Sequence, residues 1–256
     1  MDNLTKRNLK QPDQFVMTTE HGVTWVNQNR KAALTIGAIA IVLLLAIIGG
    51  YSWFAHRSAA ASSAFGEAMQ TYQRPLADQA AQLQPGTKTF PDAKARAAAA
   101  NAQFVAVANQ YGSTEPGKMA QYFAGVTYME KGDNSNAEQV LRKVADSWNG
   151  DVAALGKMAL AGLYEQTGRN GDAEKLLQEL GKGSATTVPP YMAQIQLGEL
   201  YQTEGKVTEA KRVWAQVKDK DKDPKGQPGP AGQIASEKLN PQPAAGPGGP
   251  GMRMPQ

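Results

Sequence analysis

A nine-residue segment that occurs three times constrains the fold of this chain more than any other feature. The copies begin at Ala124, Leu160 and Leu197, at intervals of 36 and 37 residues. Each copy has a small residue second, a tyrosine fifth and a glycine ninth, and an alanine and a large apolar residue follow at fixed distances. Repetition with a period of about 20–50 residues is typical of stacked structural repeats. Because alanine, glutamine, leucine and lysine dominate this region, the repeats are predicted to be helical.

The repeated residues suit a hairpin of two helices. The small residues Gly125, Ala161 and Gly198 let the helices approach closely, and the tyrosine fills the space beside them. The glycine ends the first helix in a backbone conformation that a β-carbon disfavours. The other repeated residues are Tyr128, Tyr164 and Tyr201, Gly132, Gly168 and Gly205, Ala137, Ala173 and Ala210, and Leu141, Leu177 and Trp214. This pattern resembles the tetratricopeptide repeat. Chance periodicity in an alanine-rich bundle is the alternative, and the matched offsets in three copies argue against it.

Local signals agree with three full hairpins. Pro116 and Pro190 stand where a first helical turn tolerates a missing N–H. The segment 135–138, Ser-Asn-Ala-Glu, predicts a capping box at the start of a second helix. A partial fourth unit precedes them, because Ala100, Phe104 and Val107 match the second helix of the next repeat at an interval of 37. Its first helix is expected over about residues 58–83, and a loop over 84–91.

A stretch without formal charge, residues 32–55, has the composition of a membrane-spanning helix. Its 24 residues exceed the roughly 20 that a helix needs to cross the hydrocarbon core. Tyr51, Trp53 and Phe54 lie at its end, where aromatic side chains favour the membrane interface. The sequence therefore predicts one transmembrane helix between a leader, residues 1–31, and the repeats.

The distribution of basic residues predicts the orientation of this helix. Five Lys and Arg residues precede it, namely Lys6, Arg7, Lys10, Arg30 and Lys31. The first twenty residues after it contain only Arg57 and Arg74. This asymmetry places the N-terminus in the cytoplasm and the repeats outside it. A cleaved signal peptide is the alternative, since residues 58–64 are small, but the leader and the apolar stretch are both long for one.

The end of the chain has a different composition. From Pro224 onwards, 15 of 33 residues are glycine or proline, which predicts a mostly disordered tail over residues 223–256. Residues 231–239 could form a short helix that covers the last hairpin. The predicted fold is therefore all-α, with a single transmembrane helix, a tetratricopeptide-like α-solenoid over residues 56–222 and this tail.

Residues with catalytic or metal-binding chemistry are sparse. The chain has no cysteine, and its two histidines, His21 and His56, lie on opposite sides of the apolar stretch. Residues 181–184, Gly-Lys-Gly-Ser, resemble the end of a phosphate-binding loop but lack its earlier glycine, so an inter-repeat loop is expected. A formal charge of +4 without a basic stripe does not indicate nucleic acid. We expect no catalysis, no cofactor, no metal and no small-molecule substrate.

The tetratricopeptide resemblance implies a concave protein-binding groove lined by the first helices. The positions that it assigns to this groove are Met119, Tyr122, Val126, Met129, Leu155, Met158, Glu165, Gln166, Met192, Ile195, Glu199 and Gln202. Methionine is frequent among them, and its flexible, polarizable side chain suits varied apolar segments. For Tyr122 and Ile195, ordinary packing between hairpins is the alternative.

The whole layout resembles the YfgM-type membrane-anchored tetratricopeptide proteins, ancillary partners of the bacterial Sec translocon. The resemblance covers roughly residues 15–220, with Trp25 and Asn29 ahead of the apolar stretch, then an alanine-rich hairpin and compact repeats. It implies a bacterial inner-membrane protein with periplasmic repeats, whose partners are Sec translocon subunits, periplasmic chaperones or secreted clients. A structural adaptor for envelope assembly, which binds one fixed partner, is the alternative. The proline- and glycine-rich tail departs from the family pattern.

Overall fold

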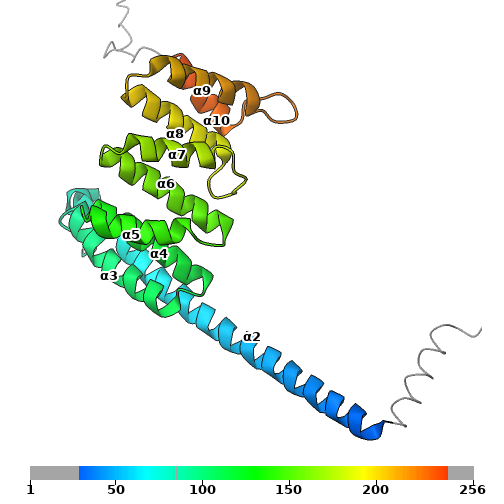
Figure 1. Ribbon diagram of the computed structural model, residues 1–256. Coiled ribbons are helices and arrows are strands. Elements are labelled where there is room, and N and C mark those ends of the chain that lie inside the picture. The colour runs from blue at the N-terminus through cyan, green and yellow to red at the C-terminus, as the bar shows by residue number, and fades with distance from the viewer. Residues whose placement is uncertain (1–28, 83, 85, 242–256) are drawn as a thin grey trace, which may run out of the picture. The chain divides into compact units, whose positions relative to one another are not determined.

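The computed structural model describes residues 29–82, 84 and 86–241, and apart from two isolated β-bridges their regular structure is helical. In chain order the elements are α2 (Arg30–Tyr72), the 3-10 helix η1 (Ala77–Gln82), α3 (Ala93–Tyr111), α4 (Glu115–Glu130), α5 (Asn134–Ala145), α6 (Gly150–Gln166), α7 (Asn170–Leu180), α8 (Pro190–Thr203), α9 (Val207–Lys220) and α10 (Pro230–Leu239) (Figure 1). The chain divides into two compact units between Arg57 and Ser58. The all-α fold is as predicted.

The first unit contains the apolar part of α2. The predicted span, residues 32–55, lies entirely within this helix, and none of its most apolar 18-residue window is buried. By length and composition the helix can cross a membrane, and a signal sequence passes the same test. The predicted leader lies almost wholly outside the described residues, and so does Trp25.

The second unit begins with the remaining part of α2, which is also the first helix of the partial hairpin. The expected helical end near residue 83 is wrong, because α2 ends at Tyr72 and the separate turn η1 follows. Pro75 explains the earlier end, since proline disfavours the helical conformation of the preceding residue, Arg74. Arg96, near the start of α3, donates a hydrogen bond to the Arg74 carbonyl (3.4 Å), so α3 runs antiparallel to α2.

Aromatic side chains join this first hairpin to α4. The ring centroid of Phe65 lies 5.8 Å from Phe104 and 5.8 Å from Phe123, and those two rings stack at 5.3 Å. Phe104 and Ala100, two residues by which the partial unit was recognised, are both completely buried in this cluster. The second helix that they predicted is α3.

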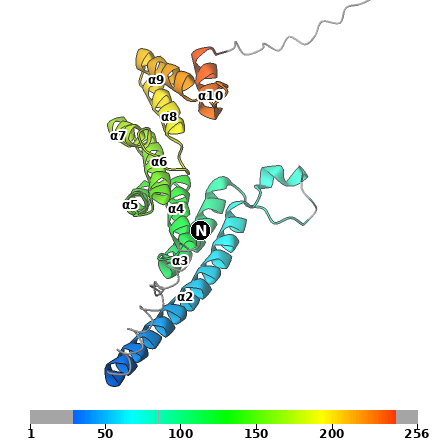
Figure 2. The same cartoon turned by 90° about the vertical axis from the view of Figure 1, so that its right-hand side faces the viewer.

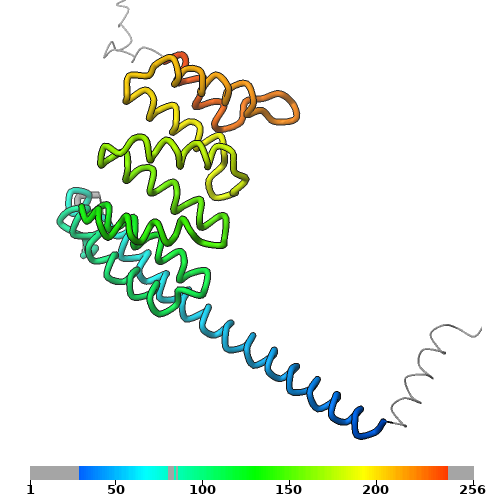
Figure 3. The backbone as a smooth tube through the Cα atoms, in the orientation of Figure 1, coloured from blue at the N-terminus to red at the C-terminus, as the bar shows by residue number. Residues whose placement is uncertain are grey.

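The next three hairpins are α4 with α5, α6 with α7, and α8 with α9, and the tube in Figure 3 shows them following one another. Each turn contains a glycine with positive φ: 85° at Gly132, 74° at Gly168 and 76° at Gly205. L-residues with a side chain rarely adopt this conformation. The predicted role of the repeated glycine as the end of the first helix is confirmed.

Close contact between the helices of a hairpin explains the small residue of the repeat. A β-carbon at Gly125 would approach the Leu141 side chain to 2.5 Å, and one at Gly198 would approach Trp214 to 2.2 Å. Ala161 is fully buried at the same offset in the middle hairpin. The small residues of the repeat are therefore buried between the two helices of each hairpin, as the pattern predicted.

The helix caps agree with the sequence in part. Pro116 and Pro190 do lie in the first turns of α4 and α8. The predicted capping box at residues 135–138 is wrong, because Asp133 is the N-cap of α5 and accepts a hydrogen bond from the Asn136 N–H (3.3 Å). Asp133 follows the turn glycine directly, so the helix begins two residues earlier than the box required.

Helix α10 lies beyond the last repeat and packs against α9 and α8. Ala231 and Ala235 are buried there, and the Asp221 carboxylate accepts a hydrogen bond from the Gly232 N–H (2.8 Å). The short helix expected over residues 231–239 is thus present, and helical structure continues past residue 222. Residues 242–256 of the tail lie outside the described residues.

Candidate protein-binding surface

The first helices of the three hairpins carry the predicted binding residues. Figure 2 shows α4, α6 and α8 following one another, with α5 and α7 on one side and α10 on the other. Helix α4 contacts α6, and α8 contacts α10. We call the twelve predicted residues on α4, α6 and α8 the first-helix face.

The members of the first-helix face on α4 are all half-buried. Tyr122 and Met129 pack against the hydrophobic core of the repeats, and the Tyr122 ring meets Phe123 edge-on at 5.2 Å. Burial raises the pKa of the Tyr122 hydroxyl. Met119 and Val126 are also partly exposed. This part of the first-helix face is therefore an apolar surface that packs directly on the hydrophobic core.

On α6 the face changes from apolar to polar along the helix. Leu155 and Met158 are half-buried and pack against a small cluster that includes Val188 and Ala193. About two turns after Met158, Glu165 is half-buried and Gln166 is exposed. A partner on this helix would therefore meet aliphatic side chains first and a carboxylate near its end.

On α8 the predicted residues separate into two groups. Met192 is 36% exposed and Gln202 is exposed, whereas Ile195 is only 4% exposed and belongs to the core. The Ile195 carbonyl accepts a hydrogen bond from the Trp214 indole N–H (3.3 Å), which ties this turn of α8 to α9. Of the two alternatives given for Ile195, the structure places it in ordinary core packing. It cannot offer its side chain to a partner.

A row of polar side chains crosses from α6 to α10. Gln196 on α8 donates a hydrogen bond to Glu165 (3.3 Å), and Lys238 on α10 pairs with Glu199 (2.6 Å). Burial raises the pKa of the Glu165 carboxyl, and the nearby charge of Glu199 adds to this effect. The sequence did not indicate Gln196 or Lys238. The pairing of Lys238 depends on how α10 packs, which no local pattern predicts.

A cleft of ≈ 790 Å³ lies elsewhere, at the loops that join one hairpin to the next. Its lining includes the end of α5, the start of α6 and residues 182–185, and none of the first-helix face. The Asp151 carboxylate accepts hydrogen bonds from the N–H (2.6 Å) and hydroxyl (3.0 Å) of Thr186, which holds the loop against α6. Gly181 caps the C-terminus of α7. Phosphate loops use a helix N-terminus, so residues 181–184 are an inter-repeat loop, as expected.

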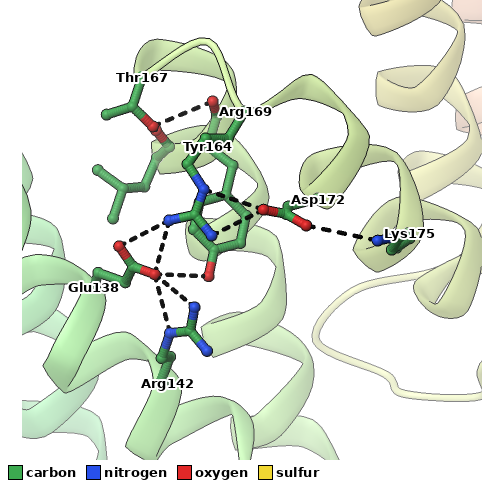
Figure 4. Close-up of polar contacts among 8 residues, drawn as sticks. Glu138, Arg142, Tyr164, Thr167, Arg169, Asp172 and Lys175 are labelled. Carbon is green, nitrogen blue, oxygen red and sulfur yellow. Dashed lines mark hydrogen bonds and ion pairs between the residues drawn. The ribbon is translucent and has the colours of Figure 1, made fainter.

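A network of charged and polar groups connects the hairpins on another side (Figure 4). The Glu138 carboxylate accepts hydrogen bonds from the Tyr164 hydroxyl (3.1 Å) and from Arg169 (2.9 and 3.0 Å) of the next hairpin. Arg142, one turn along α5, also donates to it (2.6 Å). These cations and hydrogen bonds lower the pKa of Glu138 to about 2. The network joins the α4–α5 hairpin to the α6–α7 hairpin.

A second junction repeats the tyrosine–glutamate bond, and the first junction uses an asparagine and a threonine instead. The Tyr201 hydroxyl donates to Glu174 (2.7 Å), and Asn101 donates to Thr127 (3.0 Å) beside Tyr128. Asn101, Glu138 and Glu174 occupy equivalent repeat positions, at intervals of 37 and 36 residues. The tyrosine of the repeat therefore has a second role that the sequence pattern did not reveal: its hydroxyl reaches toward the preceding hairpin.

Among residues 29–241, leaving aside 83 and 85, no group of three His, Cys, Asp or Glu residues is arranged to hold a metal ion.

The family model for the tetratricopeptide repeat-like domain matches residues 24–240. Searches of curated proteins and of solved structures gave no significant match. The family match covers the apolar helix, all three full hairpins and α10.

Proposed function

Because the chain belongs to the tetratricopeptide repeat-like domain family, we propose that it is a membrane-anchored scaffold whose first-helix face binds protein segments. In this proposal the apolar part of α2 is retained in a bacterial inner membrane, with the N-terminus in the cytoplasm and the repeats in the periplasm. The partners are Sec translocon subunits, periplasmic chaperones or secreted clients. The resemblance to YfgM-type proteins supports this assignment.

The observation that carries the proposal is that the first-helix face contains methionine side chains that are partly exposed. Met119, Met158 and Met192 combine flexible apolar side chains with partial exposure. Such side chains adapt to different apolar segments without a fixed geometry. An anchor beside the exit of a translocation channel would raise the local concentration of these weak contacts, so low affinity per contact suffices.

An adaptor that binds one fixed partner is the second candidate function. The polar residues of the first-helix face near the end of α6 favour it. Glu165 is a half-buried carboxylate whose pKa is raised by burial, so its charged form is poorly solvated. A donor from one specific partner would stabilise that charge, and a missing donor would disfavour other partners. An envelope-assembly adaptor would use the surface in this way.

Site-specific photocrosslinking in native membranes separates the two candidates. A photoreactive amino acid at Met192 should capture translocon subunits and many secreted proteins if the first proposal is correct. Capture of one stoichiometric envelope protein would favour the adaptor instead. The same amino acid at Val207, which is exposed at the start of α9 outside the face, is the matched control. Equal capture from both positions would contradict both proposals.

Substitution of the same positions tests whether methionine provides the contacts. Met192→Gln combined with Met119→Gln should reduce capture while thermal unfolding stays unchanged, because both side chains are partly exposed. Met129 and Met158 are unsuitable for this test, since both also pack against the core. Unchanged capture by the double variant would argue against the role of methionine.

A further inference from the structure

We propose that a segment of the chain's own tail, residues 252–254, docks on the first-helix face and competes there with partner segments. We call these three residues, Met-Arg-Met, the Met-Arg-Met segment. They follow Pro241, the last residue that the structure describes. The inference builds on the proposed binding role of the first-helix face, and it concerns what occupies that face before a partner binds.

Glu165 on α6 is an acidic residue of the first-helix face that lacks a cation. Its side chain is half-buried and accepts a hydrogen bond from the neutral side chain of Gln196 (3.3 Å). The other acid of the face, Glu199, already pairs with Lys238 (2.6 Å). Within the described part of the chain, no Lys or Arg forms an ion pair with Glu165. A partly buried carboxylate without a cation is poorly solvated, so a positively charged ligand beside it is favoured.

Apolar side chains of the face lie at a fixed distance from the two acids. Met158 precedes Glu165 by seven residues on α6, and Met192 precedes Glu199 by seven residues on α8. Seven residues are nearly two full turns and about 10 Å, so each methionine lies on the same side of its helix as the acid. The face therefore offers partly exposed methionines and one uncompensated carboxylate about 10 Å apart.

The Met-Arg-Met segment has chemistry that complements this surface. Arg253 is the only charged side chain after Lys238 in the sequence. Its guanidinium can donate two parallel hydrogen bonds to a carboxylate such as Glu165. Methionine stands on both sides of it, and this flexible apolar side chain packs well on irregular apolar surfaces. Three extended residues span about 10 Å, which matches the separation of the acid and the methionines on the face.

The chain leaves helix α10 beside the first-helix face. Helix α10 packs against α8 (Figure 2). Lys238, in the last turn of α10, pairs with Glu199 on α8. One turn earlier on α8, Gln196 contacts Glu165. The end of α10 is therefore connected to the uncompensated carboxylate through one ion pair, one helical turn and one hydrogen bond.

The sequence after α10 is long enough for the Met-Arg-Met segment to return to Glu165. Twelve residue steps separate Arg253 from Pro241, and they span at most about 40 Å. A tether of this length gives an effective concentration on the order of millimolar, so a contact of millimolar affinity is populated. At about half occupancy the contact changes the unfolding equilibrium only about twofold. Such a contact gives way readily to a partner.

Disulfide trapping in the full, cysteine-free chain tests this inference. Met192→Cys and Met254→Cys place one thiol on the face and one in the segment. In detergent solution with glutathione disulfide, these thiols should join within one chain about tenfold faster than a control pair, because docking holds them together. The control combines Met254→Cys with Val207→Cys, at an exposed position outside the face. Glu199 lies seven residues from Met192 and eight from Val207, so the tether alone favours neither thiol.

The ion pair is tested in the same assay. Arg253→Gln should slow trapping at position 192 about two- to fivefold, the range of a partly exposed ion pair. Glu165→Gln should slow it to the same extent while thermal unfolding stays unchanged, because glutamine keeps the oxygen that Gln196 contacts. The double variant should be no slower than either single variant. Additive effects would contradict a direct contact between Arg253 and Glu165.

Two results of the trapping experiment would overturn the proposal. Equal rates at positions 192 and 207 would show a tether without a docking site. Disulfides between chains, seen as dimers whose yield rises with protein concentration, would assign the face to a second copy instead.

Photocrosslinking in native membranes separates this inference from the proposed function. With a photoreactive amino acid at Met192, a chain that ends at Pro241 should capture partners about twice as efficiently as the full chain, because the competing segment is gone. Capture that truncation leaves unchanged would contradict the competition and leave the proposed function standing. Trapping of the segment without any capture of partners would support its docking and contradict the proposed function.

Discussion

Gly125 and Gly198 occupy the same repeat position, and each lies against a large side chain of the following helix. Their backbone conformation is not unusual, so the requirement is one of space. The β-carbon that either glycine lacks would overlap the Leu141 side chain or the Trp214 ring. At this position the repeat therefore requires a small residue. At the turns it requires a residue that can adopt a positive φ.

This distinction predicts opposite results for two glycine substitutions in first helices. Gly198→Ala should lower the free energy of unfolding by roughly 1–3 kcal/mol, because the new methyl group overpacks against Trp214. Gly162→Ala should be neutral or stabilising by up to about 1 kcal/mol, because no atom lies within 4 Å of its β-position. Thermal and urea unfolding followed by circular dichroism measures both. Similar losses in the two variants would contradict the packing argument.

Glu138 predicts a pH-dependent contribution to stability. Its pKa in the folded protein is about 2, below the ordinary value of 4.5. A lowered pKa means that the ionised carboxylate stabilises the fold above about pH 4.5, and that this contribution disappears as the pH falls toward 2. Glu138→Gln should therefore cost about 1 kcal/mol at pH 7, a value typical of partly exposed ion pairs.

The measurement is urea unfolding of both proteins between pH 7 and pH 2. The difference between them should shrink over the interval from about 4.5 to about 2. Glu209→Gln, at an exposed position on α9, is the control and should change stability by less than about 0.5 kcal/mol. A difference that is constant with pH would show that Glu138 acts by packing rather than by charge.

At the scale of elements, the helices that follow the repeat were the most predictable. The turns at Gly132, Gly168 and Gly205 divide the hairpins where the pattern placed them, because the glycine conformation is a local requirement. The end of α2 and the cap of α5 were less predictable. Helix α2 ends before Pro75 and not near residue 83 as expected. Helix α5 is capped by Asp133 and not by Ser135, the first residue of the predicted capping box.

Helix α10 gives a test of where the folded domain ends. A chain that ends at Lys222, the predicted boundary, should lose roughly 3 kcal/mol or more of unfolding free energy, because Ile234, Leu239 and the buried Ala235 no longer cover the last hairpin. A chain that ends at Pro241 should keep the stability of the full chain. Equal stability of the two truncated proteins in chemical denaturation would show that α10 is dispensable.

At the scale of the whole molecule, the absence of cysteine makes the proposed orientation testable. Asn3→Cys and Ser184→Cys each introduce one thiol into a chain that has none. With the N-terminus in the cytoplasm, a membrane-impermeant maleimide should label Ser184→Cys in spheroplasts and label Asn3→Cys only after lysis. A retained helix also requires that residues 32–55 remain in the mature protein. Labelling of both thiols before lysis, or a shortened chain, would contradict the anchored orientation.

The repeat period, the helical hairpins and the apolar helix could all be predicted from the sequence alone. Each depends on local or periodic requirements: glycine where φ is positive, a small residue where two helices touch, and an uncharged stretch of sufficient length. The candidate surface was only partly predictable, since an offset from the repeat assigns Met192 and Ile195 equally to it. Packing then exposes the first and buries the second.

Contacts between hairpins were decided by the tertiary structure. The bond from Tyr164 to Glu138, the pairing of Lys238 with Glu199 and the exposure of Trp148 depend on how separate segments meet. None of them follows from the period, because stacking angle and the position of α10 arise from the summed packing of many side chains. The sequence by itself determined what each hairpin is, and the tertiary structure determined which side chains the stack leaves available to partners.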